Sequence, residues 1–212
     1  KILFTEKNKR FLEGFSIDDL SNLSLFLGKP GDKKRGGISF TEYLRRQRLH
    51  KEAEIVSTIN SCKAATNAHG ENFICDTSGS LCEIVDPSNP EDQILTAISK
   101  KFLIICLEAD NDIHETLIQR FKSSPKPMFY REEFLKNLWK NYLLSVNKDE
   151  TRVDPNDFIL YGYKALVARR KKLYEEIGRN WGLTVNFNEV EKLKTGFDFV
   201  NIVQNKLKEK IE

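Results

Sequence analysis

The segment ENFICDTSGSLCE, from Glu71 to Glu83, places an aspartate and small hydroxyl residues directly after an apolar run. The apolar residues 73–75 are typical of a buried strand, and Asp76 with the loop Thr77, Ser78, Gly79 and Ser80 follows it. A carboxylate there can hold a metal-bound water, and a glycine lets the backbone approach an anionic group closely. The segment therefore predicts a phosphate or magnesium site, although a simple turn fits the same residues.

Basic residues later in the chain could supply the opposite charge for such a ligand. Arg120 lies in a predicted helix over 112–122, Lys126 lies within the proline-containing segment PKPMFY, and Arg131 directly follows it. Arg170 lies in a longer predicted helix over 156–179. Guanidinium and ammonium groups bind phosphate oxygens well, so Arg120, Lys126 and Arg131 predict a phosphate clamp, whereas Arg170 stands in a basic run whose role is ambiguous. The alternative is a charged surface that only faces water, which is the usual fate of such residues.

The elements that must position these side chains alternate between strand and helix. The run KFLIICLEA, residues 101–109, is continuously apolar, as expected for a parallel strand covered on both faces. The segment LTVNF, residues 183–187, predicts a second short strand. Amphipathic patterns predict helices in the following segments: 39–59, 112–122, 131–146, 156–179 and 196–210.

This alternation predicts an α/β fold with a mostly parallel sheet and helices on both faces. The strands beginning near Phe73 and Phe102 are expected to be neighbours in that sheet, because about 25 residues connect them. Ligands of such sheets bind at the carboxyl ends of the strands. That rule favours a site over a turn at Asp76.

Composition excludes several other classes of protein. The chain has 212 residues, 34 basic and 31 acidic, which gives a net charge of +3. So balanced a charge argues against nucleic acid as a partner. No apolar window approaches the roughly 18 residues that a membrane-spanning helix needs, so no membrane association is expected. The length fits a single domain.

The four cysteines, Cys62, Cys75, Cys82 and Cys106, form no CxxC pair and have no histidine at ligand spacing. A zinc site is therefore not expected, and no protein-bound metal centre is assigned. Cys75 and Cys106 lie in apolar runs and are predicted to be buried free thiols. Reduced thiols indicate a cytoplasmic protein.

Taken in order, several segments resemble the small P-loop kinases of the shikimate kinase and gluconate kinase type. They also resemble bacterial proteins described as ATPases. FICDTSGS matches a third strand with its glycine-rich loop, and LEADNDIHETLIQRF matches a fourth strand and a helix ending in Arg120. SPKPMF matches the lid, and RKKLYEEIG matches a helical motif that begins at Arg170. The resemblance covers roughly residue 37 to the end of the chain.

This resemblance implies a three-layer sandwich of the P-loop NTPase type over residues 1–212, with residues 122–156 as a lid or insertion. It implies ATP and magnesium as cofactors and an unidentified small molecule as phosphoryl acceptor. Asp76 and Arg120 would be catalytic, Ser78, Gly79, Ser80 and Arg170 would bind substrate, and Lys126 and Arg131 would cover the phosphates.

One element of the family is missing, because the sequence contains no G-x-x-x-x-G-K-[ST] motif. Two interpretations follow. Either the phosphate-binding loop lies upstream of Lys1 and the protein is an active NTPase or kinase, or the chain is a non-catalytic interaction module with a degenerate kinase-like fold.

Overall fold

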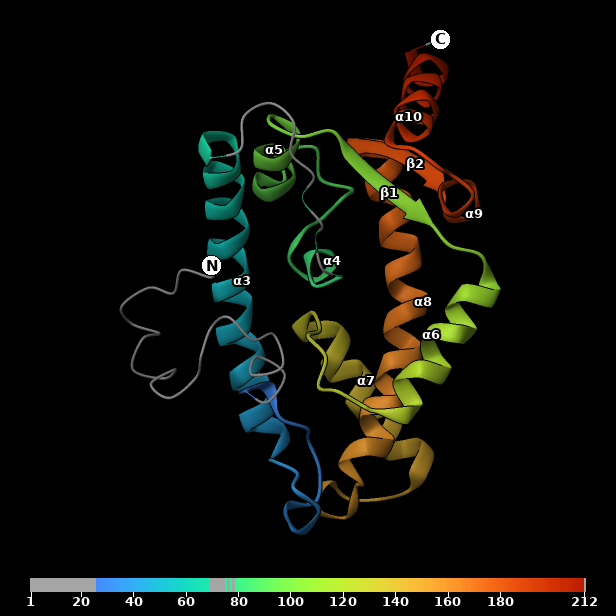
Figure 1. Cartoon of the computed structure of the whole chain (residues 1–212). Helices are drawn as coiled ribbons and strands as arrows, with labels where there is room; N and C mark the ends of the chain where they lie inside the picture. The colour runs from blue at the N-terminus through green and yellow to red at the C-terminus, as the bar shows by residue number, and fades with distance from the viewer. Residues whose placement is uncertain (1–25, 69–74, 76, 78, 212) are drawn as a thin grey trace.

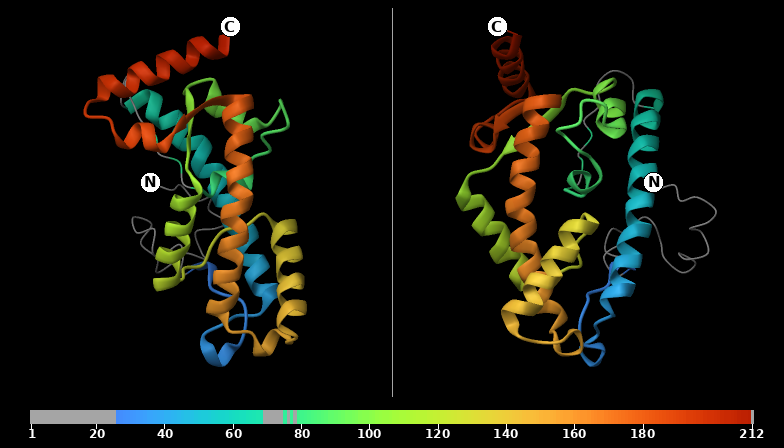
Figure 2. Two further views of the ribbon diagram at one scale, coloured as in Figure 1. Left: turned by 90° about the vertical axis from the view of Figure 1, so that its right-hand side faces the viewer. Right: turned by 180° about the vertical axis from the view of Figure 1, so that it is seen from behind.

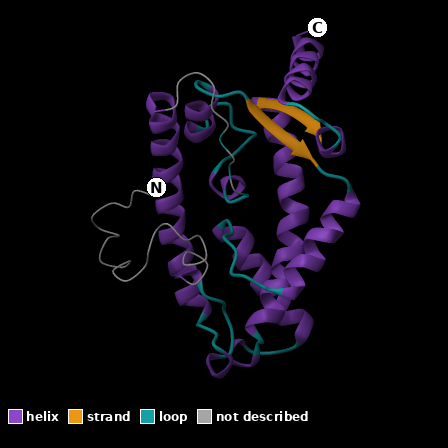
Figure 3. Cartoon of the chain, in the orientation of Figure 1, coloured by secondary structure: helices purple, strands orange, loops and turns teal. Residues whose placement is uncertain are grey.

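The computed structural model describes residues 26–68, 75, 77 and 79–211 (Figure 1). The elements run in the order η1 (Lys33–Arg35), α3 (Phe40–Ala68), α4 (Leu81–Ile84), α5 (Gln93–Ser99), β1 (Ile104–Glu108), α6 (Asn111–Ser123), α7 (Glu132–Val146), η2 (Glu150–Arg152), α8 (Pro155–Trp181), β2 (Gly182–Asn186), α9 (Phe187–Glu191) and α10 (Gly196–Ile211). Helices dominate the described part of the chain (Figure 3). The predicted helices of the second half are confirmed to within a few residues.

The long helices begin where side chains satisfy their first free N–H groups. Asp154 caps α8 by accepting a hydrogen bond from the N–H of Asn156, and Pro155 occupies the first helical position, where no N–H is needed. At α3, Ser39 accepts from the N–H of Glu42 at 3.2 Å. Phe40 donates its backbone N–H to the carboxylate of Glu150, which is distant in sequence, at 2.6 Å. This hydrogen bond links the start of α3 to η2.

The described residues contain one sheet, and it has two strands. β1 and β2 are parallel, with Ile105 opposite Leu183 and Leu107 opposite Val185. The chain between them passes through α6, α7 and α8, which is the crossover that parallel strands require. This is an α/β arrangement, but the described residues do not form the three layers that the resemblance implied. The expected neighbour of β1 at residues 73–75 lies outside them, except for Cys75, which is not in a strand.

Figures 1 and 2 show α4 and α7 between the long helices α3 and α8 in both front and rear views. The core is largely aromatic there. Phe158 of α8 packs edge-on against Trp139 of α7 at a centroid distance of 4.6 Å, and Phe40 of α3 stacks on the same indole at 4.8 Å. Thus α7, although it lies in the segment 122–156 predicted as a lid, buries one side against α3 and α8.

The cysteine prediction is half right. Cys106 is a buried free thiol, as predicted, but Cys75 is exposed, which corrects the prediction. The apolar residues around Cys75 indicated a buried strand. A strand is buried only where other elements pack on both faces of its sheet, and the residue types alone do not show this. Cys62 and Cys82 are also free and buried.

Candidate functional site

The most unusual side chain in the described core is Glu83 of α4, which is 1% exposed. Arg169 donates from Nη1 to its Oε2 at 2.9 Å, and Arg170 donates from Nε to its Oε1 at 3.1 Å. The backbone N–H of Arg131 also donates to Oε2 at 2.9 Å. A buried carboxylate is tolerated only when its charge and its lone pairs are both satisfied, and here three donors satisfy them.

Two further contacts place these arginines. The Arg131 guanidinium donates to the carbonyl oxygen of Val85, and Arg170 donates from Nη2 to the carbonyl oxygen of Phe129 at 3.2 Å. Glu83 therefore joins α4 and α8 to the segment before α7. Because the segments are distant in sequence, this junction fixes the relative position of three parts of the molecule.

Arg120, in the last turn of α6, borders the same region. Phe121 stacks on Tyr163 of α8 with ring centroids 3.7 Å apart, which brings the end of α6 against α8. Burial raises the pKa of Tyr163, and the nearby charges of Arg170 and Arg120 oppose that rise. We call Arg120, Arg131, Arg169 and Arg170 the arginine cluster.

The loop before α4 meets the cluster directly. A methyl group added at Gly79 would lie 2.5 Å from Nη1 of Arg170, so the glycine allows the guanidinium to lie against the backbone. Ser80 donates a hydrogen bond to the carboxylate of Glu54 on α3. At the rim, the pKa of exposed Asp86 is lowered chiefly by its hydrogen bond from Ser88, with a smaller contribution from Arg131.

The structure therefore brings together four of the predicted site residues, Gly79, Ser80, Arg131 and Arg170. Arg120 lies on α6, near enough to Tyr163 of α8 for its charge to lower the pKa of that residue. Lys126 is exposed in the segment between α6 and α7. Asp76 and Ser78 lie outside the described residues.

The sequence-based reasoning did not identify Glu83. The available signal was an acidic residue within the apolar run LCEIV, since a carboxylate among buried residues must have a partner. Arg169 was visible only as one of four consecutive basic residues, and nothing in that run distinguishes it from its neighbours.

Helix α3 holds the segment that carries Arg131. The Gln47 side chain donates to the carbonyl oxygen of Met128 at 2.9 Å and accepts from the N–H of Tyr130 at 3.0 Å. Tyr43 donates its hydroxyl to the same Met128 carbonyl at 3.1 Å. Gln47 thus pairs with this backbone much as a neighbouring strand would, and Arg131 is positioned as a result.

His50 lies one turn further along α3, packed edge-on against Phe129 at 4.6 Å. It is 5% exposed, and burial lowers its pKa to about 4 although Glu54 lies 3.8 Å from its Nε2. The imidazole is therefore neutral in the folded protein at neutral pH. In the unfolded chain its pKa is about 6.5.

This difference predicts a pH dependence of stability. Below pH 6.5 His50 takes up a proton in the unfolded chain, whereas in the folded protein it is protonated only near pH 4. Acid therefore favours unfolding. We expect His50 to lower the free energy of unfolding by about 2 kcal/mol between pH 7 and pH 5. Urea denaturation at both pH values, for the natural protein and for His50→Gln, measures it. Between pH 7 and pH 5 the free energy of unfolding of the variant should fall by about 2 kcal/mol less than that of the natural protein. An equal fall in both proteins would contradict the prediction.

The thiol of Cys82, which is buried beside the arginine cluster, is a poor nucleophile in the folded protein. Burial raises the pKa of Cys82 to about 11, although Arg170 and a hydrogen bond with Tyr174 act in the opposite direction. A thiol at neutral pH is a poor nucleophile. In the described part of the chain, no group of three or more His, Cys, Asp or Glu side chains could hold a metal ion.

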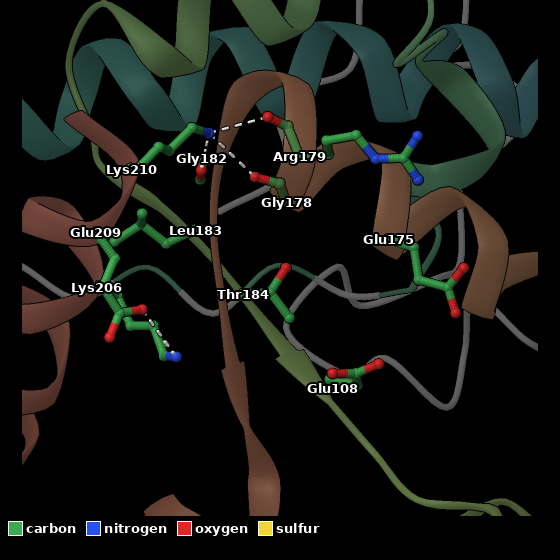
Figure 4. Close-up of a pocket in the computed structure, with 10 residues that line it drawn as sticks. All are labelled: Glu108, Glu175, Gly178, Arg179, Gly182, Leu183, Thr184, Lys206, Glu209 and Lys210. Atoms are coloured by element: carbon green, nitrogen blue, oxygen red, sulfur yellow. Dashed lines mark hydrogen bonds and ion pairs between the residues drawn. The ribbon is translucent and has the colours of Figure 1, made fainter. Parts of the chain in front are cut away.

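A pocket of about 480 Å³ lies where α8 ends, between β2 and α10 (Figure 4). Lys210 of α10 donates from Nζ to the carbonyl oxygens of Gly178, Arg179 and Gly182 at 3.4, 2.9 and 2.6 Å. These are the carbonyls that a helix end leaves without partners, and a cation there also complements the helix dipole. The contact fastens α10 to the end of α8, so we assign Lys210 a structural role.

No helix within the described residues has the length and apolar character needed to cross a bilayer. Comparison of the chain with protein-family models, with curated proteins and with solved structures finds no match.

Proposed function

We propose that this protein binds a nucleoside polyphosphate, as a P-loop NTPase or small-molecule kinase-like protein acting on ATP with magnesium. The observation that carries the proposal is the arginine cluster, in which the guanidinium groups of Arg169 and Arg170 pair with one buried carboxylate and Gly79 lies against Arg170. Guanidinium groups bind phosphate oxygens in pairs, and a glycine lets a backbone approach them.

Within this proposal each residue has a distinct role. Arg120 is the cluster member best placed to contact phosphate, because its side chain is exposed. Arg170 and Arg131, which are half-buried, would supply further positive charge, and Lys126 would cover the phosphates from the segment before α7. Asp76 would act on the magnesium side or activate the acceptor, and Ser78, Gly79 and Ser80 would face the acceptor molecule.

The parallel pair β1–β2 is the part of the proposed P-loop sandwich that lies within the described residues. The carboxyl end of β1 leads to Asp110, which accepts a hydrogen bond from Asn188 after β2. Open α/β sheets bind ligands at this edge. We further propose that the protein acts in the cytoplasm, because its four cysteines are free thiols.

One observation favours the second candidate function, a non-catalytic interaction module. Arg131, Arg169 and Arg170 already donate to Glu83 or to backbone carbonyl groups, so three cluster members have structural partners without any ligand. In that case the cluster would mainly stabilise the fold, and added nucleotide would not bind.

Calorimetric titration of the full-length protein with ATP and magnesium separates the two functions, because the interpretation as an active NTPase places the phosphate-binding loop upstream of Lys1. For the nucleotide-binding function, we expect Arg120→Gln to weaken affinity about tenfold, the loss of one charge-assisted contact. Lys122→Gln is the matched control, since it removes the same charge from an exposed position in the same helical turn and should change affinity by less than about twofold. Equal effects of both variants would contradict a specific role for Arg120, and absence of binding to the natural chain would favour the interaction module.

A further inference from the structure

The pocket between β2 and α10 is lined on the α10 side by charged groups that already have partners. Lys210 donates to three carbonyl oxygens where α8 ends, and Lys206 forms an ion pair with Glu209 at 3.2 Å. The positive charges on this side are therefore satisfied within the chain. A ligand of the pocket must be recognised by the groups on its other side.

That other side carries polar side chains with no hydrogen bond or ion pair among the described residues. Two come from α8, one from the end of β1 and one from β2: Glu175, Arg179, Glu108 and Thr184. Glu175 and Arg179 are one helical turn apart, a spacing at which such residues can form an ion pair, yet none joins them in the described structure (Figure 4). The charges of these side chains are available to a ligand.

Close packing of α8 on the sheet directs these groups to one place. A methyl group at Gly178 would overlap the hydroxyl of Thr184, so the helix backbone lies directly against this side chain. Glu175 lies three residues before Gly178 and therefore on the same side of α8. Glu108 shares a sheet face with Thr184, because Cys106 is opposite Thr184 and side chains alternate along a strand. Figure 4 shows both carboxylates on one side of Thr184, so the three groups line the same part of the pocket.

The charges of these groups favour a ligand with an excess of positive charge. Two carboxylates and one guanidinium leave one excess negative charge, and the C-terminal end of α8 adds the negative end of the helix dipole. In the described part of the chain no cluster of His, Cys, Asp and Glu is suited to a metal ion, whereas carboxylates accept the hydrogen bonds of an ammonium group well. The ligand that matches these charges has two ammonium groups and one carboxylate.

We propose that this pocket binds a basic α-amino acid of the lysine type. Its α-carboxylate pairs with Arg179 and its α-ammonium with Glu175. These two ligand groups are bonded to one carbon atom, and the two residues are about 6 Å apart along the axis of α8, so both pairs form together. The side-chain ammonium pairs with Glu108, and the hydroxyl of Thr184 is a further acceptor. The site shares no residue with the arginine cluster, so the proposal does not depend on nucleotide binding.

Calorimetric titration of the full-length protein with L-lysine tests the proposal. Arg179→Gln and Glu175→Gln should each weaken affinity at least about tenfold, the loss of one charge-assisted contact. The matched control is Glu176→Gln, which removes the same charge from the next residue of α8. Glu176 lies about 100° further round the helix and does not line the pocket, so affinity should change by less than about twofold.

Two analogues of lysine test the ligand class. L-Norleucine lacks the side-chain ammonium and cadaverine lacks the α-carboxylate, and each should bind at least about tenfold more weakly than lysine. Glu108→Gln should weaken the binding of lysine but not of norleucine, which has no group for Glu108. Absence of lysine binding at about 10 mM would overturn the proposal. Cadaverine that binds as tightly as lysine would do the same, and so would equal effects of Glu175→Gln and Glu176→Gln.

Discussion

Replacing Glu83 with glutamine is expected to lower the free energy of unfolding by about 3 to 5 kcal/mol. The side chain keeps its size, but the partly buried Arg169 and Arg170 lose the charge that compensates them. The glutamine NH₂ group would also face donors where a carboxylate oxygen accepted them. Urea denaturation followed by circular dichroism measures the change at neutral pH.

Glu42 provides the matched control, because it too binds two arginines. It contacts Arg45 at 2.7 Å and Arg46 at 2.8 Å, and hydrogen bonds from these arginines lower its pKa to about 2. Its side chain is 31% exposed, however, so water and salt screen the pairs. We expect Glu42→Gln to cost less than about 1 kcal/mol. If both variants cost the same, burial is not what makes Glu83 important.

The outcome at Glu83 also bears on the proposed function. Arg170 and the backbone of Arg131 are both held by this carboxylate. A variant that folds but has lost Glu83 leaves these arginines without fixed positions. Comparing its nucleotide affinity with that of Arg120→Gln would therefore distinguish direct contact with phosphate from positioning of the cluster.

The helices of the second half could be predicted from the sequence because their apolar residues recur at helical spacing. In the helix predicted over 131–146, the apolar residues at helical spacing include Leu135, Leu138, Trp139 and Tyr142, all of which are buried. The strand β1 could be predicted for a similar reason, from an uninterrupted apolar run. Leu107 in this strand is nevertheless 48% exposed. That could not be predicted, because such a run indicates burial on both faces and says nothing of which neighbours are present.

The site was predictable in part. Arg170 and Gly79, which are 91 positions apart, were both selected from a family resemblance, and the structure places them in contact. Composition could not have paired them, because Arg170 is one of four consecutive basic residues with similar surroundings in sequence. Glu83 was missed for a complementary reason. The sequence around a single acidic residue does not show which basic residues will pair with it. The partners of Glu83 come from α8, and that depends on how distant segments pack.

Replacing Gly182 with alanine is expected to lower the free energy of unfolding by about 3 kcal/mol, at the upper end of the cost of overpacking. Its φ of −161° suits any residue, so the cost is steric. A methyl group would overlap the Ile104 carbonyl oxygen and lie 2.8 Å from the carbonyl carbon. These are backbone atoms of β1, which cannot move away without disturbing the pairing of the two strands.

Gly196, at the start of α10, is the matched control because a methyl group there would meet no atom within 4 Å. Alanine also favours helix over glycine, so we expect Gly196→Ala to be neutral or to stabilise the protein by up to about 1 kcal/mol. Chemical denaturation of both variants tests the close approach of β1 and β2. If Gly182→Ala costs no more than Gly196→Ala, the strands do not pair in this register.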